Sequence, residues 1–552
     1  MRVKLSFPAR LAVSSGVTLA LTMFASGRPV SASGQTPAPV AQPPAGGVQT
    51  PVPTTPAQVP LTPLADPGPA LRLSADEAVR LALENNLGIQ AERLSPQINT
   101  YATSQARAAY APVLFSAFSS RNSTQPPSSF ISGSSDLLTN ESFSQNAGLG
   151  QNIKWGGGQY QFTLDGAKST TNSAESRYNP ALSSNLRASY IQPLLRNFKF
   201  DSIRQQIETS RNNQVIADIG LRETVTVTSQ AVRNAYFDLI GAIEGHKVAQ
   251  QSLQLAQDSL KNNNRKVEVG TLAPIDIIEA EAEVASNEEA VINAEARIKT
   301  VEDRLRSLIL NPTQADFWTV RLEPADAPSL TPVAIDVNAA ITNALTNRTD
   351  IARLKKQLDN VDVGIRLSEN QRLPALDVTA NYNVIGLAGT QFEYGSGFPP
   401  PVLDTKVRTF NDALRDVFGQ NFRTWSVALN FNYPLGTSQA EAGLASARLQ
   451  RQQGTQNLRE LELQVATSVR DAARSVETNL KRVEATRKAR DRAERRYAAE
   501  EKRMEVGLST TFAIFQAQRD LARQRQLEVN AMIDYNRSVV AFESIQIAPV
   551  SR

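Results

Sequence analysis

The strongest constraint in this sequence is a heptad pattern of apolar residues that extends from about Asp201 to Val267. One heptad position holds Val225, Val232, Leu239, His246, Leu253, Leu260 and Val267, and the position three residues later holds Ala235, Ala242, Ala249 and Ala256. This pattern predicts a coiled-coil helix whose alanines let a partner helix approach closely. At 1.5 Å per residue the helix is roughly 100 Å long, far longer than a typical helix of a globular protein.

A second heptad pattern follows at once, with Ile277, Val284, Val291, Ile298 and Leu305 spaced seven residues apart. The two patterns predict an antiparallel helical hairpin whose tip is "VEVGTLAPIDII", residues 267–278. A related passage, "MEVGLSTTFAIF", begins 237 positions later at Met504. The chain therefore contains two long hairpins, each with a Val-Gly turn at its tip.

The two hairpins belong to a duplication of most of the chain. "ALENNLGI" (82–89) matches "ALTNRTDI" (344–351) at an offset of 262, and Val232-Arg233 matches Val469-Arg470 at an offset of 237. The offset falls because the first half has an insert between Phe118 and Pro193. A period this long indicates a duplicated domain and not a solenoid.

The expected domains follow from this duplication. Repeat 1 covers 71–311, with strands at about 113–193 and a helical hairpin at 201–310. A connector covers 312–337. Repeat 2 covers 338–552, with strands at about 374–435 and a hairpin at 439–546. Each repeat begins with a further helix.

The N-terminus resembles a secretory signal peptide, with Arg2, Lys4 and Arg10 before an apolar stretch and small residues up to Ala32. We expect 1–32 to be the signal and 33–70 a Pro-rich flexible leader. The signal carries four of the basic charges, so the formal charge of +4 falls to about zero in the mature chain. That removes the main argument for a nucleic-acid partner.

The predicted strands alternate between apolar and polar residues. Trp425, Val427, Leu429, Phe431 and Tyr433 form one apolar face in this way, between polar or small neighbours. The apolar face either packs on the core of a soluble domain or faces lipid in a membrane barrel with a wet lumen. The residues leave both alternatives open. We expect the Gly/Ser/Asn-rich stretches 119–146 and 385–400 to form exposed loops.

Catalytic and metal sites have no support in the sequence. The chain has one histidine and no cysteine, so no transition-metal site or cofactor site is evident. His246 occupies a heptad seam position and is expected to be a packed or hydrogen-bonded seam residue. No Ser/His/Asp arrangement can be built around it.

Four stretches carry a resemblance to the TolC-like outer-membrane factor family: "AVRLALENNLGIQ", "QPLLRNF", "VEVGTLAPIDIIEAEAEV" and "MEVGLSTTFAIFQAQRDL". The resemblance covers nearly all of 71–546. It implies an α+β membrane protein in which a trimeric β-barrel in the bacterial outer membrane continues as a long α-helical coiled-coil barrel in the periplasm. Each protomer would supply four strands, and 312–337 would lie in an equatorial belt.

The resemblance also implies roles for residues at the tips. Val269, Gly270 and Thr271, with Val506, Gly507 and Leu508, would contact a periplasmic adaptor protein. Asp276 and Glu279 would form an acidic gate ring at the pore entrance, although Ala513 and Gln516 occupy the matching places of the second half, where the family's ring lies. Trp425, Val427, Leu429, Phe431 and Tyr433 would face outer-membrane lipid.

The chain departs from the family in its first-half insert. "GQNIKWGGGQYQFTL" contains a further alternating hairpin, in which Ile153 and Trp155 precede a glycine turn. This hairpin either extends the barrel wall or folds as a separate flap, which leaves the strand count open.

The function implied by the resemblance is that of a passive exit duct in a tripartite efflux or type I secretion system. An inner-membrane pump would act through the adaptor and supply the energy. The alternative is a soluble exported coiled-coil scaffold or fibre. The cargo cannot be read from the sequence.

Overall fold

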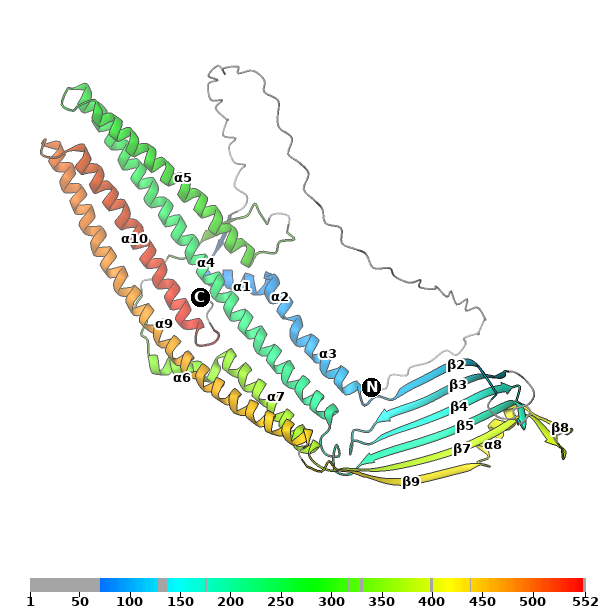
Figure 1. Ribbon diagram of the computed structural model, residues 1–552. Helices are drawn as coiled ribbons and strands as arrows, with labels where there is room; N and C mark the ends of the chain where they lie inside the picture. The colour runs from blue at the N-terminus through cyan, green and yellow to red at the C-terminus, as the bar shows by residue number, and fades with distance from the viewer. Residues whose placement is uncertain are drawn as a thin grey trace, which may run out of the picture. The chain divides into compact units, whose positions relative to one another are not determined.

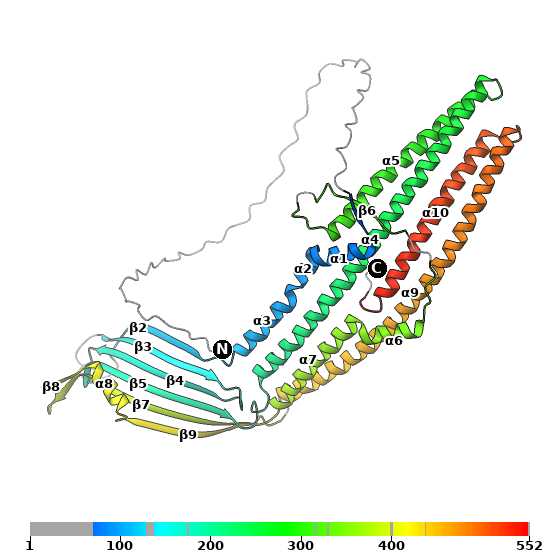
Figure 2. The ribbon, with the colours of Figure 1, turned by 180° about the vertical axis from the view of Figure 1, so that it is seen from behind.

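The computed structural model describes residues 70–127, 137–173, 176–314, 317–327, 331–397, 401–436 and 438–549. The expected signal peptide, and all of the expected leader except residue 70, lie outside the described residues. Figure 1 shows the helices and strands along the chain, and Figure 2 shows the same ribbon from behind.

Two long helical hairpins form the α-helical part. The first pairs α4 (Ser202–Glu268) with α5 (Ile275–Ile309), and the second pairs α9 (Gln439–Glu505) with α10 (Thr511–Ser544). Because α10 also packs against α4, the hairpins lie side by side (Figures 1 and 2). None of the described helices is long and apolar enough to cross a membrane.

The starts of α4 and α9 are fixed by capping. The side chains of Asp201 and Ser438 accept hydrogen bonds from the backbone N–H groups of Arg204 and Glu441. These bonds satisfy donors that the first helical turn leaves free. Both helices have 67 residues, and α4 covers the range that the heptads predict.

Two clusters of buried hydrophobic residues in the described part of the chain repeat one another, as the predicted duplication requires. In the first, Ala78 and Ala82 pack against Val232 and Leu239. In the second, the matching Ala340 and Ala344 pack with Val469 and Val476. The offsets of 262 and 237 that relate the two sequences thus also relate the two cores. In each half, a short helix packs its alanines against equivalent heptad residues of the long helix.

Shorter helices run along the long ones. They are α1 (Ala75–Asn85), α2 (Leu87–Glu92) and α3 (Leu94–Ala108) in the first half, and α6 (Val337–Asn347) and α7 (Thr349–Gln371) in the second. Contacts join α1, α2 and α3 to α4, and α6 and α7 to α9. A two-stranded parallel sheet links β1 (Ala70–Leu73) to β6 (Arg321–Pro324), so the start of the first repeat is tied to the connector.

The other sheet has seven strands in the described residues. They are β2 (Val113–Gln125), β3 (Leu138–Asn152), β4 (Gln159–Thr171), β5 (Tyr178–Pro193), β7 (Ala375–Tyr394), β8 (Val402–Arg408) and β9 (Arg423–Asn432). The order is β2-β3-β4-β5-β7, and β7 then pairs with β9 at its start and with β8 at its end. All these pairings are antiparallel.

The sequence-predicted insert hairpin joins this sheet and is not a flap. Its strands, β3 and β4, lie between β2 and β5, so six long strands stand side by side instead of the four that the resemblance implies. The assignment of Ile153 and Trp155 to a strand is wrong, because β3 ends at Asn152 and both residues belong to the turn. Ile153 N donates to Gly158 O at 2.6 Å, and Gly156 adopts a φ of 71°.

Two further predictions about this region are wrong. Much of 119–146 and 385–400 is strand and not loop: β2 continues to Gln125, β3 starts at Leu138 and β7 continues to Tyr394. Pairing with neighbouring strands satisfies the backbone groups of these polar stretches, which composition alone does not reveal. Tyr433, which was expected to belong to the lipid-facing strand, lies just beyond the end of β9 and is 45% exposed.

Helix α8 (Phe410–Phe418), between β8 and β9, was not predicted. It begins with a capping box in which Thr409 and Asp412 exchange side-chain and backbone hydrogen bonds. Among the strands, it packs against β5 and β7.

Candidate functional site

The large sheet has one apolar face, and its register shows how far that face extends. Leu376 lies opposite Phe431, Val378 opposite Leu429, and Tyr382 opposite Trp425. Facing partners in an antiparallel pair lie on the same side of a sheet, so the side chains of β7 and β9 form one surface. Trp425 is 72% exposed and Phe431 is 67% exposed. Within the described residues this part of the face is uncovered.

The same face continues across the inserted hairpin. Tyr190 lies opposite both Ala380 and Tyr160, and Ala188 lies opposite both Tyr382 and Phe162. These side chains line one shallow apolar groove together with Trp425 and Val427. This apolar surface extends over the four strands β4, β5, β7 and β9. Soluble monomeric proteins rarely expose large continuous apolar patches.

The opposite face of the sheet is polar. On β7 it carries Thr379, Asn381 and Asn383, and Arg187 of β5 lies between Asn383 and Thr163 in register. Polar groups continue across the strands, with Asp165 opposite Asn185. A sheet that is apolar on one face and polar on the other matches the wall of a membrane barrel with a wet lumen.

The two hairpin tips share one backbone geometry. At the first, Gly270 N donates to Val267 O at 3.0 Å and Thr271 N donates to Lys266 O at 2.8 Å. At the second, Gly507 N donates to Met504 O at 3.3 Å and Leu508 N to Arg503 O at 2.8 Å. Both patterns are Schellman motifs, in which the glycine takes a left-handed conformation. The φ angles are 80° at Gly270 and 74° at Gly507.

The predicted tip residues are exposed at both turns. Val269 is 77% exposed, Val506 is 69% exposed and Leu508 is 78% exposed. A Cβ built on Gly270 or Gly507 meets no atom within 4 Å. The protomer therefore requires glycine at these places for the backbone conformation and not for space. Large apolar side chains at an exposed tip offer a surface to another chain.

Asp276 and Glu279 lie at the start of α5, just past the first tip. Asp276 is in the first helical turn and is half-buried, whereas Glu279 is exposed. A carboxylate in the first turn is stabilised by the helix dipole, so Asp276 also has a local structural role. The structure brings these residues close to the Val-Gly turn of their own hairpin.

The sequence did not predict a polar contact, here called the polar joint, that connects α4 to α10 near the hairpin tips. Gln518 Nε2 on α10 donates to Ser259 Oγ on α4 at 2.8 Å. Beside it, a cavity of about 340 Å³ is lined by Asn263 of α4 and Thr511 of α10. Asn263 is 5% exposed and Thr511 is 4% exposed. Asn263 continues the spacing of the alanine line in α4, and a polar residue at such a seam position could have indicated the joint.

Burial changes the pKa of Tyr497 at this joint. Tyr497 lines the same cavity, and burial raises the pKa of its phenol above the usual value.

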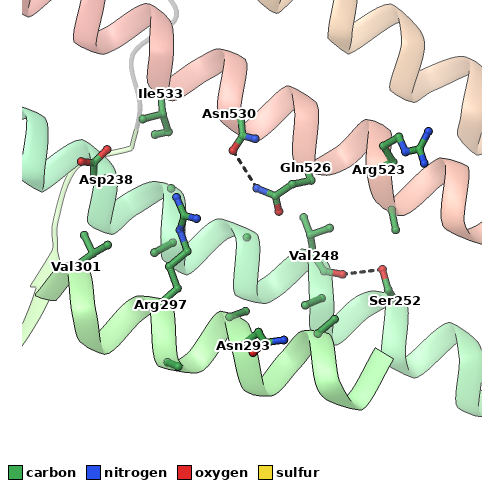
Figure 3. Close-up of a pocket in the computed structure, with 18 of the residues that line it drawn as sticks. Asp238, Val248, Ser252, Asn293, Arg297, Val301, Arg523, Gln526, Asn530 and Ile533 are labelled. Carbon is green, nitrogen blue, oxygen red and sulfur yellow. Dashed lines mark hydrogen bonds between the residues drawn. The ribbon is translucent and has the colours of Figure 1, made fainter. Parts of the chain in front are cut away.

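A larger cavity lies between α4, α5 and α10, with a volume of about 1170 Å³. Figure 3 shows Asp238 of α4, Arg297 of α5, and Gln526 and Asn530 of α10 around it. Burial raises the pKa of the Asp238 carboxyl, although the Arg537 guanidinium 3.3 Å away opposes this shift. The lining combines charged and polar side chains with apolar ones, among them Val248, Val301 and Ile533.

His246 lies in the seam between α4 and α5, as its heptad position predicts. Its side chain is 17% exposed, and its Nε2 is 3.5 Å from Glu295 Oε1 of α5.

Comparisons with known proteins agree with this geometry. A protein-family model described as "Outer membrane efflux protein" matches residues 183–309 and 340–545, more than half of the chain. No curated protein sequence matches the chain.

Solved structures of bacterial channels share the fold. The CmeC outer membrane channel of Campylobacter jejuni has a TM-score of 0.60 and 14% identity, over 86% of this chain and 85% of that chain. VceC of Vibrio cholerae has a TM-score of 0.59 and 16% identity, over 86% and 97%. The open state of the MtrE channel of Neisseria gonorrhoeae has a TM-score of 0.58 and 17% identity, over 87% and 90%.

The chain thus shares the fold of these solved structures, and the family model covers both halves of the duplication. The chain belongs to the outer membrane efflux protein family.

Proposed function

We propose that three copies of this chain form a passive exit duct, with a β-barrel in the outer membrane and a helical barrel in the periplasm. The observation that carries the proposal is the uncovered apolar face of the sheet, backed by a polar face. Lipid covers the first face and water the second, so no other domain is needed to bury Trp425 or Phe431. The energy comes from an inner-membrane pump.

The edges of the sheet support closure between copies. In the part of the chain that the structure describes, β2 and β9 each pair with one strand only, β2 with β3 and β9 with β7. β2 leads away from α3 and β9 leads back to α9, so β2 of one copy can pair in antiparallel fashion with β9 of the next. Unpaired strand edges are unfavourable in lipid, and closure of the ring pairs the free edges of β2 and β9.

The width of this barrel differs from what the resemblance implies. Six long strands from each of three copies give eighteen strands instead of twelve. Barrel diameter grows roughly linearly with strand number, and barrels of 16 to 18 strands leave an aqueous channel. The inserted hairpin therefore widens the outer-membrane end of the duct.

The periplasmic end opens when an adaptor protein docks on the tips. The exposed Val269 and Thr271 at the first tip, with Val506 and Leu508 at the second, provide the contact surface. Gly270 and Gly507 hold the turns in the left-handed conformation that presents these side chains.

Asp276 and Glu279 supply an acidic ring just inside the tips. Three copies gather six carboxylates around the axis, which favours cations and opposes full closure by like-charge repulsion. The second hairpin contributes the uncharged Ala513 and Gln516 at the matching places, so the ring is built by the first repeat alone.

Conductance across a planar lipid bilayer tests this function. The purified protein without its signal segment should give stable steps in current, with a preference for cations. A protein that stays soluble without detergent and gives no steps would instead indicate the scaffold alternative, with the apolar face buried against another chain.

A further inference from the structure

Helix α8 covers one end of the apolar face of the sheet. Ala413 is 0% exposed and Val417 is 1% exposed, and both belong to the buried side of this helix. A Cβ on Gly386 of β7 would lie 1.9 Å from Ala413 O, so the helix backbone rests directly on the strand. Gly386 lies on the same face as Tyr382, because the two are four residues apart in one strand.

Helix α8 rests on β7 just beyond the residues that pair with β9. On β7 the face from Leu376 to Val384 pairs with β9. At the end of this stretch and beyond it, Val384, Gly386 and Ala388 are buried. A stretch of about nine residues is close to what a tilted barrel strand needs to cross the hydrocarbon core. Because Leu376 is at the end of β7 next to α7, α8 lies where the apolar band ends on the other side, towards the cell exterior.

Cationic side chains surround α8 on this face. The Arg415 side chain is 83% exposed. Arg423 is an exposed residue of β9, two before Trp425 and on the same face. Lys168 is an exposed residue of β4, two after Gly166, whose Cβ would lie 3.1 Å from Phe410 Cζ of α8. In the described part of the chain, Lys168 and Arg423 have no ion-pair partner, and Arg415 has only Asp412.

Exposed aromatic residues lie among these cations. Phe418 at the end of α8 is 69% exposed, Phe422 before β9 is 59% exposed, and Phe143 is 49% exposed opposite Lys168. Aromatic rings at the edge of an apolar band, next to basic residues, are typical of the boundary between acyl chains and headgroups.

We propose that α8 is an interfacial helix and that Lys168, Arg415 and Arg423 bind the phosphate groups of anionic lipid in the outer leaflet. The inference rests on the proposed function, since it takes the apolar face as the lipid-facing wall. The charge supports it, because three exposed cations border a lipid-facing surface and two of them have no acidic partner. Charge-assisted hydrogen bonds to phosphate are among the strong ones.

Lipid binding by the detergent-solubilised full-length protein tests this site. The probe is lipid A with two phosphates, compared with zwitterionic phosphatidylcholine, and bound lipid is quantified by native mass spectrometry. The combined Lys168→Gln, Arg415→Gln and Arg423→Gln variant should bind lipid A about tenfold more weakly, the loss expected from a net change of about 1.4 kcal/mol. Phosphatidylcholine retention should not change.

Arg121→Gln is the matched control, because Arg121 is an exposed cation of β2 on the opposite face of the same sheet. It should bind lipid A as the unaltered chain does. Equal lipid A affinity of the triple variant and the unaltered chain overturns the inference, as does an equal loss in the control.

Channel recordings in phosphatidylcholine bilayers separate this result from the proposed function. The triple variant should conduct as the unaltered chain does, because the three cations are outside the lumen. If the unaltered chain forms no channels, the proposed function fails. If it conducts while lipid A binding is insensitive to the substitutions, the lipid site alone fails.

Discussion

At the scale of single residues, the shape of each hairpin tip depends on one glycine, Gly270 in the first tip and Gly507 in the second. The Val-Gly pair predicted a turn, and the positive φ of Gly270 and Gly507 gives the physical reason. The sequence could not show that Val269 and Leu508 remain exposed, because exposure depends on what packs around the tip. It missed Asn263 and Thr511 because their burial arises only when two distant helices meet.

The tip glycines are expected to be needed for export. Replacing Gly270 and Gly507 with Ala forces a left-handed conformation on a residue with a Cβ, at a cost of about 1–2 kcal/mol for each tip. The turns should then change shape, and export of a cargo dye or drug from cells should fall while trimer recovery in detergent stays the same.

Gly443→Ala is the control for this pair. Gly443 lies in α9 without a positive φ, and a Cβ there has open space. This substitution should leave export unchanged and slightly stabilise the helix. Normal export by the Gly270→Ala, Gly507→Ala chain would contradict the role of the tips.

The acidic residues past the first tip should determine ion preference. Asp276→Asn with Glu279→Gln removes six negative charges from the assembled trimer, so the reversal potential in a salt gradient should move towards that of a non-selective pore. Glu289→Gln, farther along α5, should have a smaller effect. An unchanged reversal potential in the Asp276, Glu279 variant would rule out the ring.

At the scale of helices and strands, periodicity predicted most of what forms. Heptads predicted α4 and α5, and alternation predicted β9 and the first part of β7, because both patterns follow from a buried stripe or face. Alternation does not predict the strand segments that are rich in Ser, Asn and Gly, because a strand with water on both faces needs no apolar face. Helix α8 was missed because it is only nine residues long.

Tyr236 offers a test of how α4 is joined to the small parallel sheet. Its hydroxyl is 3.1 Å from Leu73 O and accepts a hydrogen bond from Asp326 N at 3.2 Å. Burial raises the pKa of Tyr236 to about 12 from 10.0. The folded protein therefore favours the neutral phenol, and this stabilisation is fully present below pH 10 and is lost as the pH rises from 10 through 12.

Tyr236→Phe should lower the free energy of unfolding by about 1 kcal/mol at pH 8 through the lost hydrogen bonds. The difference from the unaltered chain should shrink and then reverse between pH 10 and 12, as followed by denaturant unfolding and circular dichroism. Tyr101→Phe, at an exposed tyrosine (76%), should follow the unaltered chain throughout. A constant difference at every pH would show that the Tyr236 phenol does not ionise in this range.

At the scale of the whole molecule, the duplication determines the plan of the chain. The repeat could be read from the sequence, and so could the presence of an insert between Phe118 and Pro193. The sequence could not show that the insert adds two strands to the sheet, because a hairpin in lipid and a flap in water can have the same alternation. The register of β3 with β2 and of β4 with β5 resolves this.

The uncovered apolar face also decides between a duct and a scaffold. In a soluble scaffold some element would have to cover Trp425, Leu429 and Phe431. Within the described residues, α8 covers the end of the face at Gly386, whereas these three side chains are between 64% and 72% exposed. A wall in contact with lipid accounts for them without any further element.

Single-cysteine labelling of protein reconstituted in liposomes tests this central claim most directly, because the chain has no cysteine of its own. Ser426 and Val427 are neighbours in β9 with side chains on opposite faces. We predict that Ser426→Cys reacts with a water-soluble maleimide that can enter the pore. Val427→Cys should react only with a maleimide confined to the lipid phase. Rapid reaction of both cysteines with the water-soluble reagent would contradict a sheet with lipid on one face and water on the other.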